Sequence, residues 1–274
     1  MAPNDIAKTA ITTPFGLFEF LRMPFGLKNS AQAFQRLMNG LFKKISFAFV
    51  YLDDILVASD SPAQHSLHLR HIFSVLQDAG LAINKKKCVF GVSSVKFLGH
   101  TVSKDGIVPL AAKVQAIVGM TRPLTTELLQ RFLGCVNFYH RFVPHLAAIL
   151  APLHALVSSV ATQKAPLVWT EEHVRAFSRA KSALSDAVML SHPIPGAPLA
   201  LTTDASDVAV GAVLSQGPYT SSPSPLAFFS KKLSAAEKNY SAFDKELLAV
   251  YLACLLYTSP SPRDLSTSRM PSSA

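Results

Sequence analysis

Cysteine is scarce in this sequence of 274 residues. The three cysteines, Cys88, Cys135 and Cys254, lie far apart, and no two of them share the spacing of a metal-binding motif. This scarcity excludes a zinc site built on cysteine pairs and is typical of a protein from a reducing compartment.

Long apolar segments are also lacking. The longest apolar run, Leu247–Tyr257, is about half of what a membrane-spanning helix needs, so we expect no membrane partner. The first residues contain no basic segment followed by an apolar stretch, which argues against a signal peptide.

Acidic residues are outnumbered by basic ones. The chain has 17 Asp and Glu against 26 Lys and Arg, which gives a net charge of +9 and an isoelectric point near 9.5. This excess favours a polyanionic partner, with nucleic acid first and an anionic membrane surface second. Hydrophobic residues make up 49% of the chain, so we expect a sizeable core and no global disorder.

Two helices are predicted in the first third of the chain. Apolar residues in Lys28–Phe42 recur at the spacing of an amphipathic helix. A second helix is predicted over Pro62–Ala79, where Ser61 can cap the start, proline occupies the first turn and Gly80 follows the end.

Between these helices an acidic pair separates two β-prone runs. Phe47–Leu52 and Ile55–Ala58 predict a hairpin with Asp53 and Asp54 at its tip. Two adjacent carboxylates repel each other, and a pair of Mg²⁺ ions that serve phosphoryl transfer is the usual way to neutralise them. From the tetrapeptide Tyr51–Asp54 alone, a solvated Asp–Asp turn is an equally good interpretation.

The middle of the chain changes from strand-like to helical. Val89–Phe90 and Val95–His100 are β-prone, and Asp105–Gly106 is a strong turn signal. Leu110–Val157 then has a helical pattern, in which prolines predict three breaks. These prolines are Pro123, Pro144 and Pro152.

The last third predicts a second domain. The segment Ser158–Pro166 has the composition of a linker, and Thr170 opens a further helix. Three strands are predicted at Leu199–Thr203, Val208–Leu214 and Leu226–Ser230. A final helix contains Phe243 and Cys254, and after Tyr257 the sequence becomes rich in Ser, Pro and Thr.

These features occur in a sequence that strongly resembles the reverse transcriptases of gypsy-type LTR retrotransposons, from about Asp5 to Tyr257. The motifs that carry the resemblance are Leu21–Ser30, Ala33–Asn39, Val50–Leu56, His68–Leu69, Lys87–Phe90, Phe97–His100, Arg131–Gly134, Asn137–Phe142 and Pro152–Leu153. Their order and spacing are those of the family.

The resemblance implies catalytic and metal-binding roles for Asp53 and Asp54 in the polymerase palm. It also implies that several residues bind nucleic acid or the incoming nucleotide. These are Phe25 and Gly26 in a loop on the nucleotide and template side, Lys87 for the triphosphate, and the primer-gripping hairpin Phe97, Leu98, Gly99 and His100. For Gly26 an ordinary turn, and for Lys87 an ordinary surface lysine, are the competing interpretations.

A second set of residues resembles a retrotransposon ribonuclease H domain. Asp204 lies at the end of a predicted strand and Glu246 in the last predicted helix. The resemblance implies that both are catalytic, and that they lie close enough to share a divalent metal.

The implied fold is α+β, in four segments. Residues 1–108 would form a palm remnant with an antiparallel sheet and helices, 109–165 a helical thumb, and 166–257 a partial α/β ribonuclease H-like domain. Residues 258–274 are expected to be a disordered, non-native tail.

The implied activity is RNA-directed DNA polymerisation combined with ribonuclease H. Its implied cofactor is Mg²⁺, two ions per active site, with Mn²⁺ as a substitute. Its partners would be an RNA template, a DNA primer, dNTPs, an RNA–DNA hybrid and the remainder of the Pol polyprotein, in a cytoplasmic retrotransposon particle. The family's first palm aspartate and next ribonuclease H aspartate are not found, so we expect an inactive fragment, and a non-catalytic nucleic-acid-binding remnant is the alternative.

Two further patterns have simple interpretations. His65, His68 and His71 recur at helical spacing, and an exposed helix face is favoured over a metal site. Aromatic residues near the predicted thumb could stack on bases, but a packed helical core is favoured. They are Phe132, Phe138, Tyr139 and Phe142.

Overall fold

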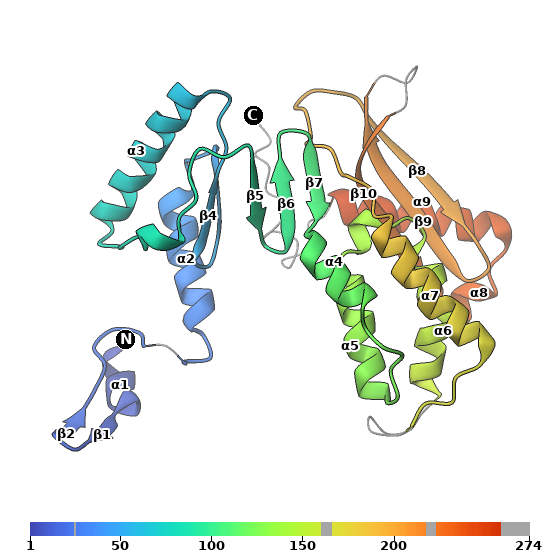
Figure 1. Ribbon diagram of the computed structural model, residues 1–274, viewed down its shortest axis with the longest axis horizontal. Coiled ribbons are helices and arrows are strands. Elements are labelled where there is room, and N and C mark those ends of the chain that lie inside the picture. Colours follow the sequence, from blue (N-terminus) through green and yellow to red (C-terminus); the bar gives the residue numbers. More distant parts are fainter. Residues whose placement is uncertain (25, 160–165, 218–222, 259–274) are drawn as a thin grey trace. The chain divides into compact units, whose positions relative to one another are not determined.

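The computed structural model describes residues 1–24, 26–159, 166–217 and 223–258. The chain divides into two compact units, Met1–Gly91 and Val92–Ala274 (Figure 1). Each unit has its own apolar clusters, so each is described by itself.

The first unit begins with a short helical segment and a hairpin. Its elements are α1 (Pro3–Ile6), η1 (Ala7–Thr9), β1 (Ile11–Thr13), β2 (Gly16–Phe18), α2 (Ser30–Phe42), β3 (Ala48–Tyr51), β4 (Asp54–Val57), α3 (Pro62–Asp78) and η2 (Lys85–Lys87). Strands β1 and β2 pair with each other, as do β3 and β4, and both pairs are antiparallel.

The core of the first unit joins α2, α3 and the β3–β4 hairpin. Its buried members come mainly from the two helices and are Met38, Phe42, Ile45, Ile72 and Leu76. Inward-facing residues of the hairpin, such as Val50 and Ile55, pack against them. The predicted caps of α3 are confirmed, because the Ser61 hydroxyl accepts a hydrogen bond from the Gln64 amide and Pro62 occupies the first turn.

The second unit opens with a three-stranded antiparallel sheet of β5 (Ser94–Phe97), β6 (His100–Ser103) and β7 (Gly106–Pro109). The turn predicted from Asp105 and Gly106 is confirmed between β6 and β7, where Lys104 and Asp105 form it and Gly106 begins β7. Two details of the prediction were wrong. Val89–Phe90 is not a strand, and Val95–His100 is not one continuous strand, because the chain reverses at Leu98 and Gly99.

Four helices follow the small sheet and share a large core. They are α4 (Ala111–Val118), α5 (Thr126–Asn137), α6 (Leu146–Ser158) and α7 (Glu171–Ser185), with η3 (His140–Phe142) between α5 and α6. Side chains such as Leu129, Phe132 and Leu153 are almost completely buried among them.

The break predicted at Pro152 does not occur, because α6 continues through this proline. A proline inside a helix removes one backbone hydrogen bond. Burial of Leu150, Leu153 and Leu156 on both sides of Pro152 offsets that loss.

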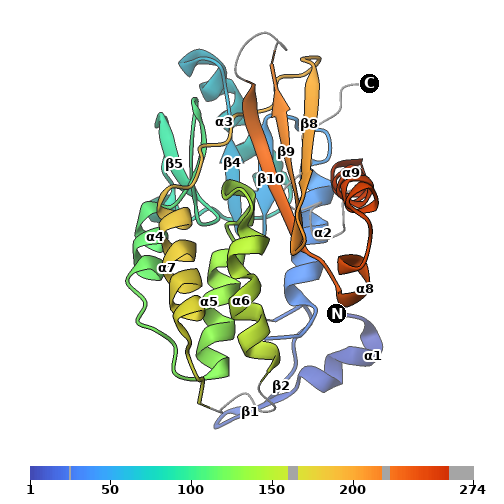
Figure 2. The ribbon, with the colours of Figure 1, turned by 90° about the vertical axis from the view of Figure 1, so that its right-hand side faces the viewer.

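A second antiparallel sheet lies near the end of the chain, with the strand order β10–β9–β8. Its strands are β8 (Leu199–Ala205), β9 (Ala209–Gln216) and β10 (Ser224–Lys232), and α8 (Ala235–Lys238) and α9 (Ala242–Thr258) follow. Helix α9 packs against β8 and β9, whereas α6 packs against β9 and β10 from the other face (Figures 1 and 2).

The alternation of side chains confirms that this sheet has a helix on each face. Phe228 joins the core of the four helices, whereas Phe229, the next residue in β10, packs with Ala249 of α9. Successive residues of a strand point to opposite faces, so the sheet is covered on both sides.

These elements confirm the predicted α+β class. The predicted tail, residues 258–274, lies outside the described residues except for Thr258, the last residue of α9. The predicted boundaries at 108 and 165 remain predictions, although α7 shares its core with α4 and α6. In the part of the chain that the structure describes, no helix is long and apolar enough to span a bilayer.

Gly106 provides a test of the contact between β7 and the segment after α7. It has a φ of 149°, and a Cβ atom there would collide with the Leu190 carbonyl oxygen, next to the backbone bridge between Ile107 and Leu190. We expect Gly106→Ala to lower the free energy of unfolding by about 2–4 kcal/mol, as measured by chemical denaturation.

Gly134 is the matched control. It lies in α5 with an ordinary helical φ, and no atom lies within 4 Å of the position that a Cβ would occupy. Gly134→Ala should raise stability by up to about 1 kcal/mol. Equal stability of the two variants would contradict the described packing at Gly106.

Candidate functional site

The tip of the β3–β4 hairpin carries two adjacent carboxylates. Tyr51 pairs with Asp54, so that Leu52 and Asp53 form the two-residue turn. Both aspartates are exposed, as predicted. Neither carboxylate has a hydrogen bond or ion pair with another residue in the described part of the chain.

This arrangement suits a hard cation. Carboxylate oxygens are the ligands that Mg²⁺ prefers, and Mg²⁺ usually takes one or two of them and completes its shell with water and substrate phosphates. The unpartnered, exposed pair fits that ligand set. Among the described residues, no group of three or more His, Cys, Asp and Glu side chains could hold a metal ion.

The other predicted polymerase residues of the first unit are Phe25, Gly26 and Lys87. Phe25 lies outside the described residues. Gly26 is exposed and has a φ of 90°, a conformation that favours glycine, with no atom near the position of a Cβ. Lys87 ends the exposed η2 turn, where the Asn84 side chain accepts a hydrogen bond from the Lys86 amide.

The predicted primer-gripping residues form a tight turn. Leu98 and Gly99 connect β5 to β6 with φ angles of 47° and 80°. The Tyr139 hydroxyl donates a hydrogen bond of 3.0 Å to the Gly99 carbonyl oxygen. The Phe138 ring lies against Gly99 at the distance where a Cβ would be crowded, so this position requires glycine.

His100 fixes the same turn from the β6 side. Its ring stacks on Phe138 and on Phe142, with centroid distances of 5.6 and 5.3 Å. Burial lowers the pKa of His100, which favours a neutral ring in this aromatic cluster.

The aromatic residues behave largely as predicted. Phe132, Tyr139 and Phe142 belong to the buried core, but Phe138 is 57% exposed.

The interpretation of the three histidines as an exposed helix face was wrong for two of them. His65 and His68 are half-buried and place their Nδ1 atoms 3.1 and 2.8 Å from the Ser59 hydroxyl, and only His71 is exposed.

The two predicted ribonuclease H residues come from elements in contact. Asp204 lies in β8 and Glu246 in α9, and both are exposed. Ala205 packs with the α9 cluster, so alternation places Asp204 on the other side of β8. Its cross-strand neighbour Gly211 accordingly faces the ring of His145. A metal ion shared by Asp204 and Glu246 therefore remains a prediction. It would require the two carboxylates to approach each other past the edge of β8.

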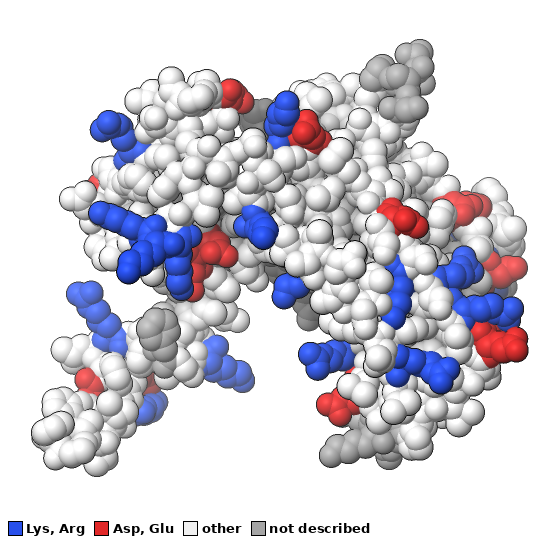
Figure 3. Space-filling model, viewed as in Figure 1, with Lys and Arg blue, Asp and Glu red and all other residues white. Residues whose placement is uncertain are grey.

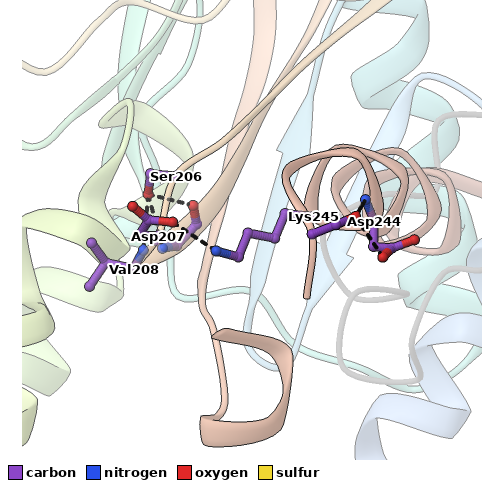
Figure 4. Close-up of polar contacts among 7 residues, drawn as sticks. Ser206, Asp207, Val208, Asp244 and Lys245 are labelled. Atoms are coloured by element: carbon purple, nitrogen blue, oxygen red, sulfur yellow. Dashed lines mark hydrogen bonds and ion pairs between the residues drawn. The ribbon is translucent and has the colours of Figure 1, made fainter. Parts of the chain in front are cut away.

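An ion pair next to these residues was not predicted. Lys245 of α9 is only 8% exposed, and its Nζ lies 2.7 Å from Asp207 in the β8–β9 turn (Figure 4). The neighbouring Ser206 closes this turn, because its hydroxyl donates to the Ala209 carbonyl oxygen and accepts from the Ala209 amide. The hydrogen bond and charge of Lys245 lower the pKa of Asp207.

Charge is distributed over both units. Figure 3 shows Lys and Arg side chains in several separate groups on this face, with fewer Asp and Glu beside them. This distribution agrees with the net charge of +9 and offers many contacts for a phosphate backbone.

Comparison with known families agrees with this architecture. Residues 1–102 match the family of reverse transcriptases, described as RNA-dependent DNA polymerases, and residues 169–258 match the RNase H-like domain found in reverse transcriptase. Together the two matches cover more than half of the chain.

Individual relatives give the same result. The chain is 38% identical over 258 residues to the retrovirus-related Pol polyprotein from transposon 297 of Drosophila melanogaster. This alignment covers 92% of this chain and 23% of that protein. It is 36% identical over 249 residues to the transposon Tf2-3 polyprotein of Schizosaccharomyces pombe. This second alignment covers 90% of this chain and 18% of that protein. The chain thus spans about a quarter or less of these relatives.

Solved structures show the same fold. A foamy viral protease-reverse transcriptase in complex with an RNA/DNA hybrid matches with a TM-score of 0.82 and 27% identity, over 94% of this chain and 34% of that one. Another structure of this viral protein, in complex with double-stranded DNA, matches with a TM-score of 0.84 over 94% of this chain and 45% of that one.

The fold and the family matches define a reverse transcriptase domain followed by an RNase H-like domain. The chain belongs to the reverse transcriptase family, with a polymerase domain followed by an RNase H-like domain. Its similarity extends over about nine tenths of its length to the Pol polyproteins of transposons.

The ion pair between Lys245 and Asp207 makes a testable contribution to stability. Asp207→Asn would leave the buried ammonium group of Lys245 without its counter-ion, so we expect a lower melting temperature at pH 7. Because the pKa of Asp207 is lowered in the folded chain, its contribution is complete above the ordinary pKa of 3.8 and is lost as the pH falls through the lower, folded value.

Thermal melts between pH 7 and pH 3 would measure this effect. The difference between the parent chain and Asp207→Asn should be largest at neutral pH and should shrink below about pH 3.8. Asp186→Asn, at the exposed end of α7, is the control and should melt like the parent. A pH-independent difference would show that the ion pair is not its cause.

Proposed function

We propose that this chain supplies the palm, thumb and first ribonuclease H elements of an RNA-directed DNA polymerase from an LTR retrotransposon. The observation that carries the proposal is the pair of exposed, unpartnered carboxylates at the tip of the β3–β4 hairpin, in a chain that belongs to the reverse transcriptase family. No structural role within the described residues accounts for two like charges at this position.

Asp53 and Asp54 would hold Mg²⁺, or Mn²⁺ in its place. Bound there, the metal would stabilise the negative charge that develops as the primer 3′ oxygen attacks a dNTP. The protein's part is to keep both carboxylates exposed and fixed on one rigid turn. Lys87 would contribute positive charge toward the triphosphate.

The turn at Leu98 and Gly99 would hold the primer strand. Its backbone is fixed by the Tyr139 hydroxyl and by the aromatic ring of Phe138, so it offers a rigid surface without a charged side chain at the tip. Gly26 would let the nucleic-acid backbone approach closely, because it has no side chain and no neighbour at its Cβ position.

The ribonuclease H part would use Asp204 and Glu246 to bind Mg²⁺ and cleave the RNA strand of an RNA–DNA hybrid. The relative solved with an RNA/DNA hybrid supports this class of substrate. An RNA template, a DNA primer, dNTPs and the remainder of the Pol polyprotein complete the proposed partners, within a cytoplasmic particle.

The competing proposal is a non-catalytic protein that only holds nucleic acid. The excess of Lys and Arg over Asp and Glu supports it. Binding and catalysis must therefore be measured separately.

Binding should be dominated by phosphate contacts. We expect the 274-residue chain to bind a primer–template duplex with an affinity that falls steeply with salt, because each neutralised B-DNA phosphate contributes a log–log slope of about −0.9. Fluorescence anisotropy over a salt series from about 50 to about 300 mM would measure the slope. Affinity that does not change with ionic strength would indicate contact through apolar surface and would contradict this mode of binding.

Catalysis should require more than Asp53 and Asp54. We expect the 274-residue chain not to extend a DNA primer on a homopolymer RNA template with Mg²⁺ or Mn²⁺. Two carboxylates on one turn neutralise only part of the charge of two metal ions. A metal site without a further ligand would lose transition-state stabilisation worth several orders of magnitude in rate, since each factor of ten corresponds to about 1.36 kcal/mol.

Extension should appear when the upstream part of the polymerase domain of a related Pol polyprotein is joined in frame. In that longer protein, Asp53→Asn should lower kcat at least about a hundredfold. Asp78→Asn, at the end of α3, should leave it unchanged. Extension by the 274-residue chain, abolished by Asp53→Asn, would show that the site is already complete, and an active Asp53→Asn variant would contradict the assigned role.

A further inference from the structure

The tip that carries the two aspartates contains a strained backbone. Leu52 has a φ of 49°, in the left-handed region that side chains other than Gly, Asn and Asp seldom adopt. Such a conformation persists only where the surroundings hold it in place. At this turn, a side chain of α2 does so.

That side chain is Gln35. Its Oε1 accepts a hydrogen bond of 2.5 Å from the Leu52 backbone amide, and its Nε2 donates one of 3.2 Å to the Val50 carbonyl oxygen. The same Nε2 donates to Asn39, one turn further along α2, at 2.8 Å. The half-buried amide thus uses one acceptor and both donor hydrogens.

The three partners also fix which way the amide points. Exchanging its oxygen and nitrogen would bring the NH₂ group against the Leu52 N–H and the oxygen against the Val50 carbonyl. Both contacts would then be repulsive, so only one orientation satisfies the turn.

Through these bonds the turn is tied to the core. Helix α2, which carries Gln35, is anchored by Met38 and Phe42 in the apolar cluster of the first unit. Asp53 follows directly after Leu52, and Asp54 is paired with Tyr51 on the other strand. The direction in which both carboxylates leave the backbone therefore depends on the conformation that Gln35 holds.

We infer that Gln35 is a positioning residue that fixes the turn of Leu52 and thereby presents Asp53 and Asp54 to a shared divalent cation. This inference rests on the proposed metal-binding role of the two aspartates. The three hydrogen bonds of Gln35 are to Leu52, Val50 and Asn39, so its effect on the carboxylates is exerted through the backbone of the turn.

Two measurements on the 274-residue chain test the inference. The first is hydrogen exchange at the Leu52 amide, followed by NMR, and the second is binding of Mn²⁺, followed by the paramagnetic broadening of hairpin resonances. Gln35→Met keeps the length of the side chain but removes its acceptor and donors. It should make the Leu52 amide exchange about tenfold faster and raise the Kd for Mn²⁺ at least about threefold.

Gln32 is the matched control, because it lies one turn earlier on α2 and is exposed. Gln32→Met should leave both measurements unchanged. Gln35→Glu keeps an acceptor for the Leu52 amide and should restore slow exchange, which a general loss of folding would not do.

The outcomes separate this inference from the proposed function. If Asp53→Asn weakens Mn²⁺ binding and Gln35→Met does not, or if Leu52 exchange is unaffected by Gln35→Met, the role of Gln35 is overturned while the metal site stands. If Asp53→Asn leaves Mn²⁺ binding unchanged, the proposed metal site fails, and the positioning role fails with it. Weaker binding in both variants together with faster Leu52 exchange supports the inference.

Discussion

A hydrogen bond or ion pair from a polar side chain to a hairpin turn is the interaction on which each candidate site depends. Gln35 holds the turn of β3 and β4, Tyr139 holds the turn of β5 and β6, and Lys245 holds the turn of β8 and β9. Two-residue turns expose their backbone groups and often need residues with a left-handed backbone conformation. A partner from a packed helical region makes such a turn rigid, and only a rigid turn can hold a functional group in one place.

The three turns differ in what they present. The first presents two carboxylates, the second a backbone without charge, and the third an aspartate already neutralised by a buried lysine. The contrast between Asp53 and Asp207 is informative, since both are exposed aspartates in hairpin turns. Asp207 has a cation of the protein beside it and therefore serves the fold, whereas Asp53 has none among the described residues and is available to a cation from solution.

The basic surface and the acidic tip have complementary roles in the proposed function. A polyanionic template is attracted by the excess of Lys and Arg, and this attraction is long-ranged and screened by salt. The carboxylates act only at short range, where a divalent metal can bridge them to a phosphate. Because neither Asp53 nor Asp54 is paired with a basic side chain among the described residues, both would stay available to a metal while Lys and Arg elsewhere contact phosphates.

Local patterns in the sequence determined much of the fold. The hairpin with Asp53 and Asp54 at its tip, the caps of α3 and the three strands of the last sheet follow from periodicity and turn residues, which act between neighbours in the chain. The tertiary structure alone decided the rest. Helix α6 continues through Pro152 because the leucines on either side of it in the same helix are buried in the core of the second unit. His65 and His68 turn inward to Ser59, and Gln35 and Lys245 have partners 17 and 38 residues away. A lone glutamine or lysine on a helix carries no sign in the sequence of which turn it will meet, because that meeting is fixed by the packing of whole elements against one another.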